Sequence, residues 1–112
     1  MIYVVLFLLL WISPVQAASV SLIWDSTPRA TGYKVYRAEK PCNQITTPQV
    51  DFRVVASSVL QPSYVDATIS DRTRHVCYVV TAYNNAGESP FSNSVGKTFN
   101  LAPSSPTKPT FK

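Results

Sequence analysis

Histidine, cysteine, serine and carboxylate side chains are the groups of this chain that could carry chemistry. The only histidine is His75, and a hydrolytic triad would place it between an orienting acid and a serine nucleophile. No serine is flanked by the glycines of a nucleophile elbow, and no third residue is placed to orient the imidazole. The sequence therefore predicts no catalytic residue.

The six acidic residues stand singly along the chain. Such spacing provides neither the paired carboxylates of glycoside hydrolysis nor a calcium-binding loop. A glycine-rich phosphate loop is absent, and a metal site needs more ligands than one histidine and two cysteines supply. We therefore expect no enzyme activity, no cofactor and no metal. The acidic residues are Asp25, Glu39, Asp51, Asp66, Asp71 and Glu88.

The N-terminal segment predicts export. Residues 1–12 are an almost unbroken apolar run. Val15 and Ala17 are small enough for the −3 and −1 positions that signal peptidase recognises before its cleavage site. We therefore predict that residues 1–17 are a secretory signal peptide and that the protein is secreted, periplasmic or extracellular. The run is shorter than the about 20 apolar residues that cross a bilayer, so no retained membrane span is expected. A retained anchor is the alternative, since no Lys or Arg precedes the run.

Cys42 and Cys77 are the only cysteines, and an even number in an exported protein indicates a disulfide. Closing a loop of about 35 residues would stabilise the fold by up to about 4 kcal/mol in the chain-entropy model. Two free thiols are the alternative.

The 112 residues divide into three parts. After the signal peptide, residues 18–99 have room for one small core but not for a core and a catalytic cleft. Residues 100–112 contain three prolines, two serines and two lysines with little to bury, which predicts a disordered tail. The net charge of +4 is mild and lacks the clustered basic stripe of a nucleic-acid-binding protein.

Apolar residues recur at every second position and predict a series of short strands. Val20, Leu22 and Trp24 share one face of the first, and Tyr33 and Val35 point inward from the second. No segment keeps an apolar period of 3.6 over ten residues, so a sandwich or barrel is expected. The predicted strands are residues 20–24, 33–37, 52–56, 63–68, 76–83 and 92–98, with a long loop at 41–51 and a glycine turn at 84–87.

Four pieces of the chain, in this order and spacing, resemble the fibronectin type III family. They are VSLIW at 20–24, GYKVY at 32–36, SYVD at 63–66, and YVVTA at 78–82 leading into NAGES at 85–89. The resemblance implies an all-β, immunoglobulin-like sandwich of two sheets and seven strands. It also implies a family that is almost entirely non-catalytic and serves as spacer, adhesive or ligand-binding module.

The chain departs from this family at three places. The exported part begins about where the family's second strand does, so the first strand is expected to be missing and one sheet edge uncovered. Val76 stands where the family has a tyrosine that pins a corner, so the disulfide is expected to fasten that end. The loop at 70–75 lacks the usual glycine. In the two-sheet arrangement Cys42 and Cys77 fall at the same end, which makes their bond reasonable.

Two candidate binding surfaces follow from the strand pattern. If Val76, Tyr78, Val80 and Ala82 face inward, then Cys77, Val79, Thr81 and Tyr83 face outward, beside Tyr36 on the neighbouring strand. The first surface is the aromatic face formed by Tyr36, Val79 and Tyr83, which suits a sugar ring or a partner protein. Its alternative is ordinary cross-strand pairing, at about 0.2–1 kcal/mol for each pair. The second surface is a set of loops that would contact an anionic polymer, formed by Lys40, Arg72, Arg74 and His75; its alternative is a pair of solvated loops.

These observations predict a non-catalytic exported module that binds protein or carbohydrate, or acts as a spacer, at the cell envelope. Its expected partner is an unknown protein or polysaccharide of that envelope. The alternative is a structural subunit that joins another chain through the uncovered strand edge by β-augmentation.

Overall fold

A computed structural model describes residues 18–100, 108 and 110–112. The predicted signal peptide, 1–17, and most of the predicted tail lie outside these residues, so both stay predictions. No helix in the described part of the chain is long and apolar enough to cross a membrane.

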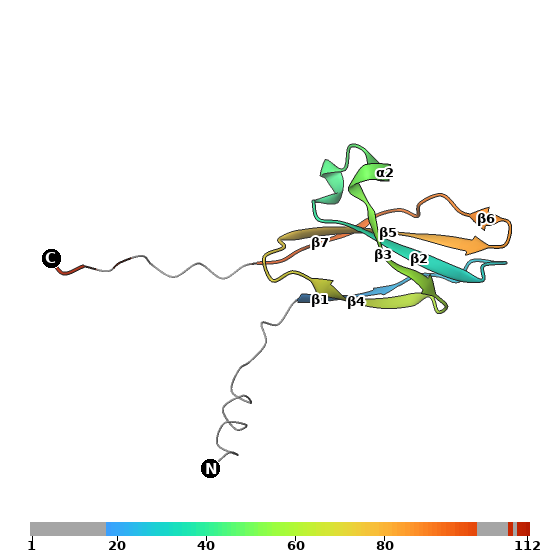
Figure 1. The fold of residues 1–112 in the computed structure, drawn as a ribbon, viewed down its shortest axis with the longest axis horizontal. Coiled ribbons are helices and arrows are strands. Elements are labelled where there is room, and N and C mark those ends of the chain that lie inside the picture. Colours follow the sequence, from blue (N-terminus) through green and yellow to red (C-terminus); the bar gives the residue numbers. More distant parts are fainter. Residues whose placement is uncertain (1–17, 101–107, 109) are drawn as a thin grey trace, which may run out of the picture.

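The chain folds as two antiparallel sheets (Figure 1). The small sheet pairs β1 with β4, and the large sheet has the order β3-β2-β5, with both β6 and β7 paired to β5. This confirms the predicted all-β, immunoglobulin-like sandwich. The strands are β1 (Ala18–Ile23), β2 (Gly32–Ala38), β3 (Arg53–Val59), β4 (Ser63–Ile69), β5 (His75–Asn84), β6 (Gly87–Glu88) and β7 (Val95–Thr98).

All six predicted strands are present, with shifted ends. The predicted loop at 41–51 is more ordered than expected, because it contains a 3-10 turn, Cys42–Gln44, and the one-turn helix α2, Pro48–Asp51. Pro48 begins that helix, where a missing N–H costs nothing, and the Asp51 side chain accepts hydrogen bonds from the backbone N–H groups of Thr46 and Thr47.

The two sheets enclose the core that the alternation of apolar residues predicted. Val35, Ile69, Val76 and Tyr78 are buried, and Val20 reaches them from β1. Trp24, just after β1, packs edge-to-face on Tyr33, with ring centroids 5.4 Å apart. Together with the half-buried residues around them, these side chains hold the two layers together.

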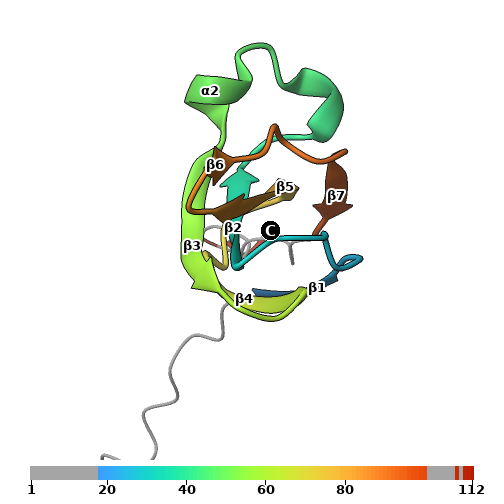
Figure 2. The ribbon, with the colours of Figure 1, turned by 90° about the vertical axis from the view of Figure 1, so that its right-hand side faces the viewer.

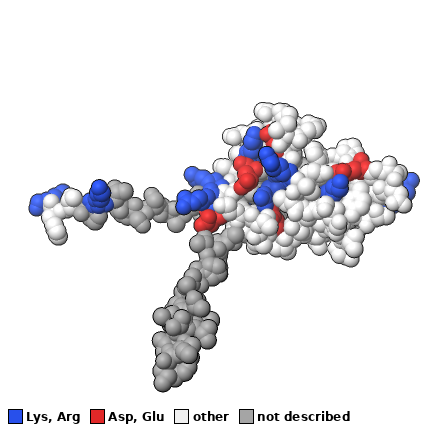
Figure 3. All heavy atoms as spheres, in the orientation of Figure 1, with Lys and Arg blue, Asp and Glu red and all other residues white. Residues whose placement is uncertain are grey.

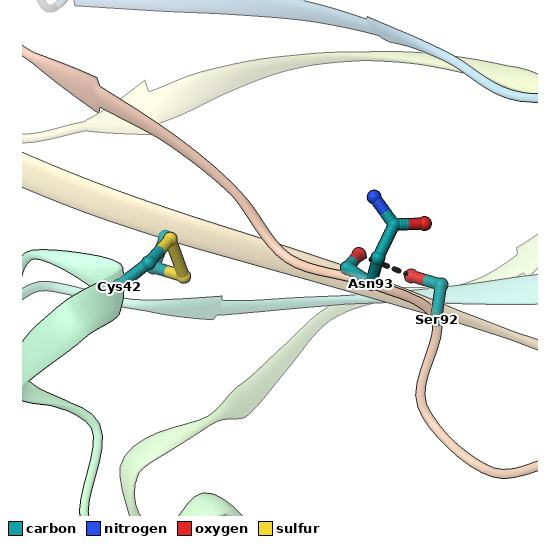
Figure 4. The surroundings of a disulfide bond; sticks show 4 residues. Cys42, Ser92 and Asn93 are labelled. Atoms are coloured by element: carbon teal, nitrogen blue, oxygen red, sulfur yellow. Dashed lines mark hydrogen bonds between the residues drawn. A yellow bond between two sulfur atoms is a disulfide. The ribbon is translucent and has the colours of Figure 1, made fainter.

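The predicted disulfide between Cys42 and Cys77 is present, with 5.1 Å between the two Cα atoms. Figure 4 shows it joining the segment that carries the 3-10 turn to the long strand β5, beside the chain that leads from Ser92 and Asn93 into β7. Gly96 of β7 lies directly beneath the bond, because a Cβ there would be 3.0 Å from the Cys42 sulfur. A side chain at position 96 would therefore push the Cys42 sulfur aside by a few tenths of an ångström.

A buried polar cluster links the two sheets. Asp66 of β4 is fully buried and accepts hydrogen bonds from Arg37 of β2 at 2.7 Å and from the Tyr78 hydroxyl of β5 at 2.6 Å. The Thr68 hydroxyl and backbone N–H bind its other carboxylate oxygen at 2.6 and 3.0 Å. Tyr78, two residues after Val76, therefore supplies a tyrosine hydroxyl bond between the two sheets.

Opposing effects act on the pKa of Asp66. Burial raises it, whereas hydrogen bonds from Thr68, Tyr78 and Arg37 lower it, and the bonds prevail so that the pKa falls to about 2 from the ordinary 3.8. Burial and the Asp66 carboxylate together raise the pKa of Tyr78, so its hydroxyl stays protonated and donates.

The low pKa of Asp66 predicts acid sensitivity. A carboxylate whose folded pKa lies below its unfolded pKa stabilises the fold above the unfolded value and loses that contribution as the pH falls through the folded value. Between about pH 4 and pH 2 we expect this group alone to remove about 2 kcal/mol of stability. Urea unfolding at several pH values measures it, and Asp66→Asn should show a smaller loss over the same interval. An equal loss in both proteins would assign the acid sensitivity to other carboxylates.

Candidate functional site

The structure corrects the predicted aromatic face. The outward side of β5 is covered, so that Val79 is only 3% exposed and Cys77 is fully buried. Phe52, which follows α2, and Phe91 pack with them in a second apolar cluster. Tyr36, Val79 and Tyr83 therefore do not form one open surface. The physical reason is that the loop at 41–52, held down by the disulfide, supplies a lid that local alternation cannot reveal.

Glu88 organises what remains of the predicted face. Its carboxylate accepts hydrogen bonds from the hydroxyls of Tyr36 at 2.5 Å and Thr81 at 2.7 Å, and it pairs with Lys34 at 3.1 Å. These bonds lower the pKa of Glu88, that from Tyr36 having the largest effect. Burial, reinforced by Glu88, raises the pKa of Tyr36. Tyr36 also packs edge-to-face on Phe91, with centroids 5.1 Å apart, so its role here is to hold the β5–β6 hairpin on β2.

Tyr83 lies at the other end of β5, in a different setting. It pairs with Gly32 across the sheet, and its ring occupies the space above that glycine, where a Cβ would come within 2.6 Å of the ring. Its backbone oxygen accepts hydrogen bonds from the N–H and the hydroxyl of Thr31. A glycine thus lets a half-buried tyrosine lie flat at the edge of the domain.

A groove opens beside Tyr83, between the β1–β2 loop and the β5–β6 hairpin. Its volume is about 490 Å³, and we call it the hairpin groove. Asn84 holds its two walls together by donating from its side-chain amide to the carbonyl of Arg29 at 3.0 Å. Arg29 itself has a positive φ of 67°, which turns the loop tip sharply. The groove is lined by Thr27, Pro28, Arg29, Ala30 and by residues 82–84 and 86–89.

The groove offers mixed chemistry for recognition. Tyr83 contributes a flat aromatic surface with a polar tip, and Arg29 and Glu88 contribute opposite charges. No group of three or more histidine, cysteine, aspartate or glutamate side chains that could hold a metal occurs among the described residues. His75 hydrogen-bonds the Thr98 hydroxyl at 3.1 Å, and it lies on β5 at the end away from this groove.

The predicted anion-contact loops lie at that far end. Lys40 forms an ion pair with Asp51 at 3.0 Å, which ties it to α2. Arg72 and Arg74 are exposed, and neither pairs with an acid of the described part of the chain. Strand pairing adds Lys97, which lies opposite Val76. Figure 3 shows basic side chains at the end of the sandwich from which the C-terminal segment leaves. Anion binding there stays a prediction.

The sequence alone did not reveal two hydrogen-bonded clusters. Asp66 and Glu88 were treated as isolated acids, although each is the centre of a hydrogen-bonded group. A signal existed for Asp66, because the alternation that turns Tyr64 inward also turns Asp66 inward, and a buried carboxylate needs partners. No comparable local signal identified Phe91 as a residue that packs over Val79.

The fold and the groove define an immunoglobulin-like sandwich module with two loops converging at one end. The structure is similar to that of a Fn3-like protein from Clostridium thermocellum, with a TM-score of 0.57 and 24% sequence identity. The similarity covers 75% of this chain and 80% of that one, and it supports the fold alone. No protein-family description and no curated protein matches this sequence.

Proposed function

We propose that this chain is a non-catalytic exported module that binds a protein or polysaccharide of the cell envelope through the hairpin groove. One observation carries the proposal: Tyr83, Arg29 and Glu88 line the same groove, and hydrogen bonds already join the walls of that groove. A groove ordered before binding loses little conformational entropy when a partner arrives. Of the aromatic face that the sequence predicts, this proposal keeps Tyr83 as a binding residue and leaves out the buried Val79.

The test is retention of a cell-surface fraction on the immobilised protein. We expect Tyr83→Ala combined with Arg29→Glu to reduce retention at least about tenfold, because aromatic and arginine side chains contribute most to such interfaces. Arg53→Glu is the matched control, since Arg53 is exposed at the start of β3, away from the groove. Loss of retention with an unchanged melting temperature supports the groove. Equal retention by all three proteins would contradict it.

A second candidate is a structural subunit that assembles through an uncovered strand edge. It is favoured by the small sheet, in which β1 has a strand partner, β4, on one side only among the residues that the structure describes. A spacer built in this way would need no groove and no ligand.

A further inference from the structure

One side of the sandwich is open. Figure 2 looks along the strands and shows β3, the edge strand of the large sheet, on one side of the sandwich running towards β4, with β1 and β7 on the opposite side. There two hollows of about 480 and 220 Å³ run between the two strands and share Leu22, Tyr78 and Val95. We call this continuous hollow the β1–β7 groove. It exposes apolar core surface at a sheet edge, which folded domains normally protect.

The hydrogen bonding of β1 shows which backbone groups face the open side. The Trp24 N–H donates to the Pro62 carbonyl of the chain leading into β4. Backbone groups of an antiparallel strand point alternately to either side, so Leu22 and Val20 also bond toward β4, whereas Ser21 and Ile23 point their N–H and C=O groups to the open edge. Within the described residues no strand receives them.

This edge lacks the features that usually prevent pairing. Strand β1, of sequence ASVSLI, contains no charged residue and no proline. If two copies pair antiparallel about Ser21, Val20 of one lies opposite Leu22 of the other. Every inward residue then meets an inward residue, and the alternation of both strands is preserved. Strand β1 is therefore complementary to itself.

The charges at the two ends of the groove complement each other in the same arrangement. Lys97 lines the groove beside Val20, and Asp25 lines it beside Trp24, at the opposite end of β1. An antiparallel second β1 ends in its own Asp25 at the end where the first copy has Lys97, and the reverse holds by symmetry. Two Asp25–Lys97 pairs would thus form across a two-fold axis.

We propose that two copies of this chain associate through β1 to form a four-stranded sheet of order β4-β1-β1-β4, closed by two Asp25–Lys97 ion pairs. The inference rests on the second candidate function and names the partner as a second copy. Because each strand offers only a few residues, the dimer is weak, with half-association expected at about 10–100 µM or above.

The test uses the full chain as its host exports it, with the N-terminus established by mass spectrometry and association followed by sedimentation velocity. Ser21→Pro removes an N–H that faces the open edge and leaves the bonds to β4 intact, so it should abolish the dimer. The matched control is Val65→Pro, because Val65 lies directly opposite Ser21 and its N–H faces the other edge of the same sheet. This control should still dimerise.

A charge exchange tests the ion pairs separately. Lys97→Glu alone and Asp25→Lys alone should each weaken self-association about fivefold or more, because each places like charges at both ends of the interface. Mixed in equal amounts, these two proteins should form a heterodimer in which both pairs are attractive. Failure of the mixture to associate would overturn the proposed register. A strictly monomeric wild type, or a dimer unaffected by Ser21→Pro, would overturn the proposal as a whole.

These outcomes are independent of the hairpin groove. The Tyr83 and Arg29 variants leave β1 unchanged, so they should sediment like the wild type whatever they retain from the cell surface. The proposed interface and the proposed ligand site can therefore fail separately.

Discussion

Replacing Asp66 with alanine is expected to lower the free energy of unfolding by about 3–5 kcal/mol, the usual cost of removing one partner of a buried ion pair. The change leaves the Arg37 guanidinium and the Tyr78 hydroxyl without their acceptor between the sheets. It also releases the Thr68 hydroxyl and N–H. Such a loss is a large fraction of the stability of a small domain. Urea unfolding followed by far-ultraviolet circular dichroism measures it.

Two further variants show which part of the cluster matters. Tyr78→Phe removes only the hydroxyl, so the expected loss is about 1–2 kcal/mol. Asp71→Asn changes an exposed acid outside the cluster and should leave stability within about 0.5 kcal/mol of the wild type. If Asp66→Ala unfolded at the same urea concentration as the wild type, the buried cluster would not be what joins the two sheets.

Removing the disulfide, by replacing both Cys42 and Cys77 with alanine, should cost about 3–4 kcal/mol. The two residues are 35 positions apart, and the loop-closure model relates that length to the denatured-state entropy that the bond removes. The same bond holds the lid, including Phe52, over Val79, so its loss should also loosen the second apolar cluster. Urea unfolding of the double variant beside the oxidised wild type gives the stability difference.

A fluorescent probe of exposed apolar surface separates the two effects of the disulfide. If the bond fastens the lid, the double variant should bind more 8-anilinonaphthalene-1-sulfonate under native conditions than the wild type. The Asp66→Asn protein is a useful comparison, because Asp66 belongs to the cluster between the sheets and not to the lid. Unchanged dye binding together with a full stability loss would mean that the bond acts only on the unfolded chain.

The positions of the strands could be predicted from the sequence because alternation is a local property. The inward side chains of β2 and β5 alternate with a period of two, and the turn before Gly87 carries residues suited to a tight hairpin. The disulfide was predictable as well, since only two cysteines were present to pair. The ends of strands were less predictable, because they depend on which neighbours continue to pair.

The aromatic face was mispredicted because its burial depends on distant segments. Alternation correctly assigns Val79 to the outer side of the sheet. Phe52 and Phe91 cover it there, and they come from loops that precede and follow β5 in the sequence. Glu88 likewise gathers Lys34, Tyr36 and Thr81 from two other strands. No periodicity within one strand relates these residues to one another.

By itself, then, the sequence determined the strands, the layer to which each inward side chain belongs, and the cysteine pair, because these follow from short-range backbone geometry and from composition. Only the tertiary structure decided which outward surfaces stay open. Burial of Val79, the partners of Asp66, and the groove between β1 and β7 all arise where segments remote in sequence meet or leave a gap. The surfaces available for binding are consequently a property of packing and not of any single strand.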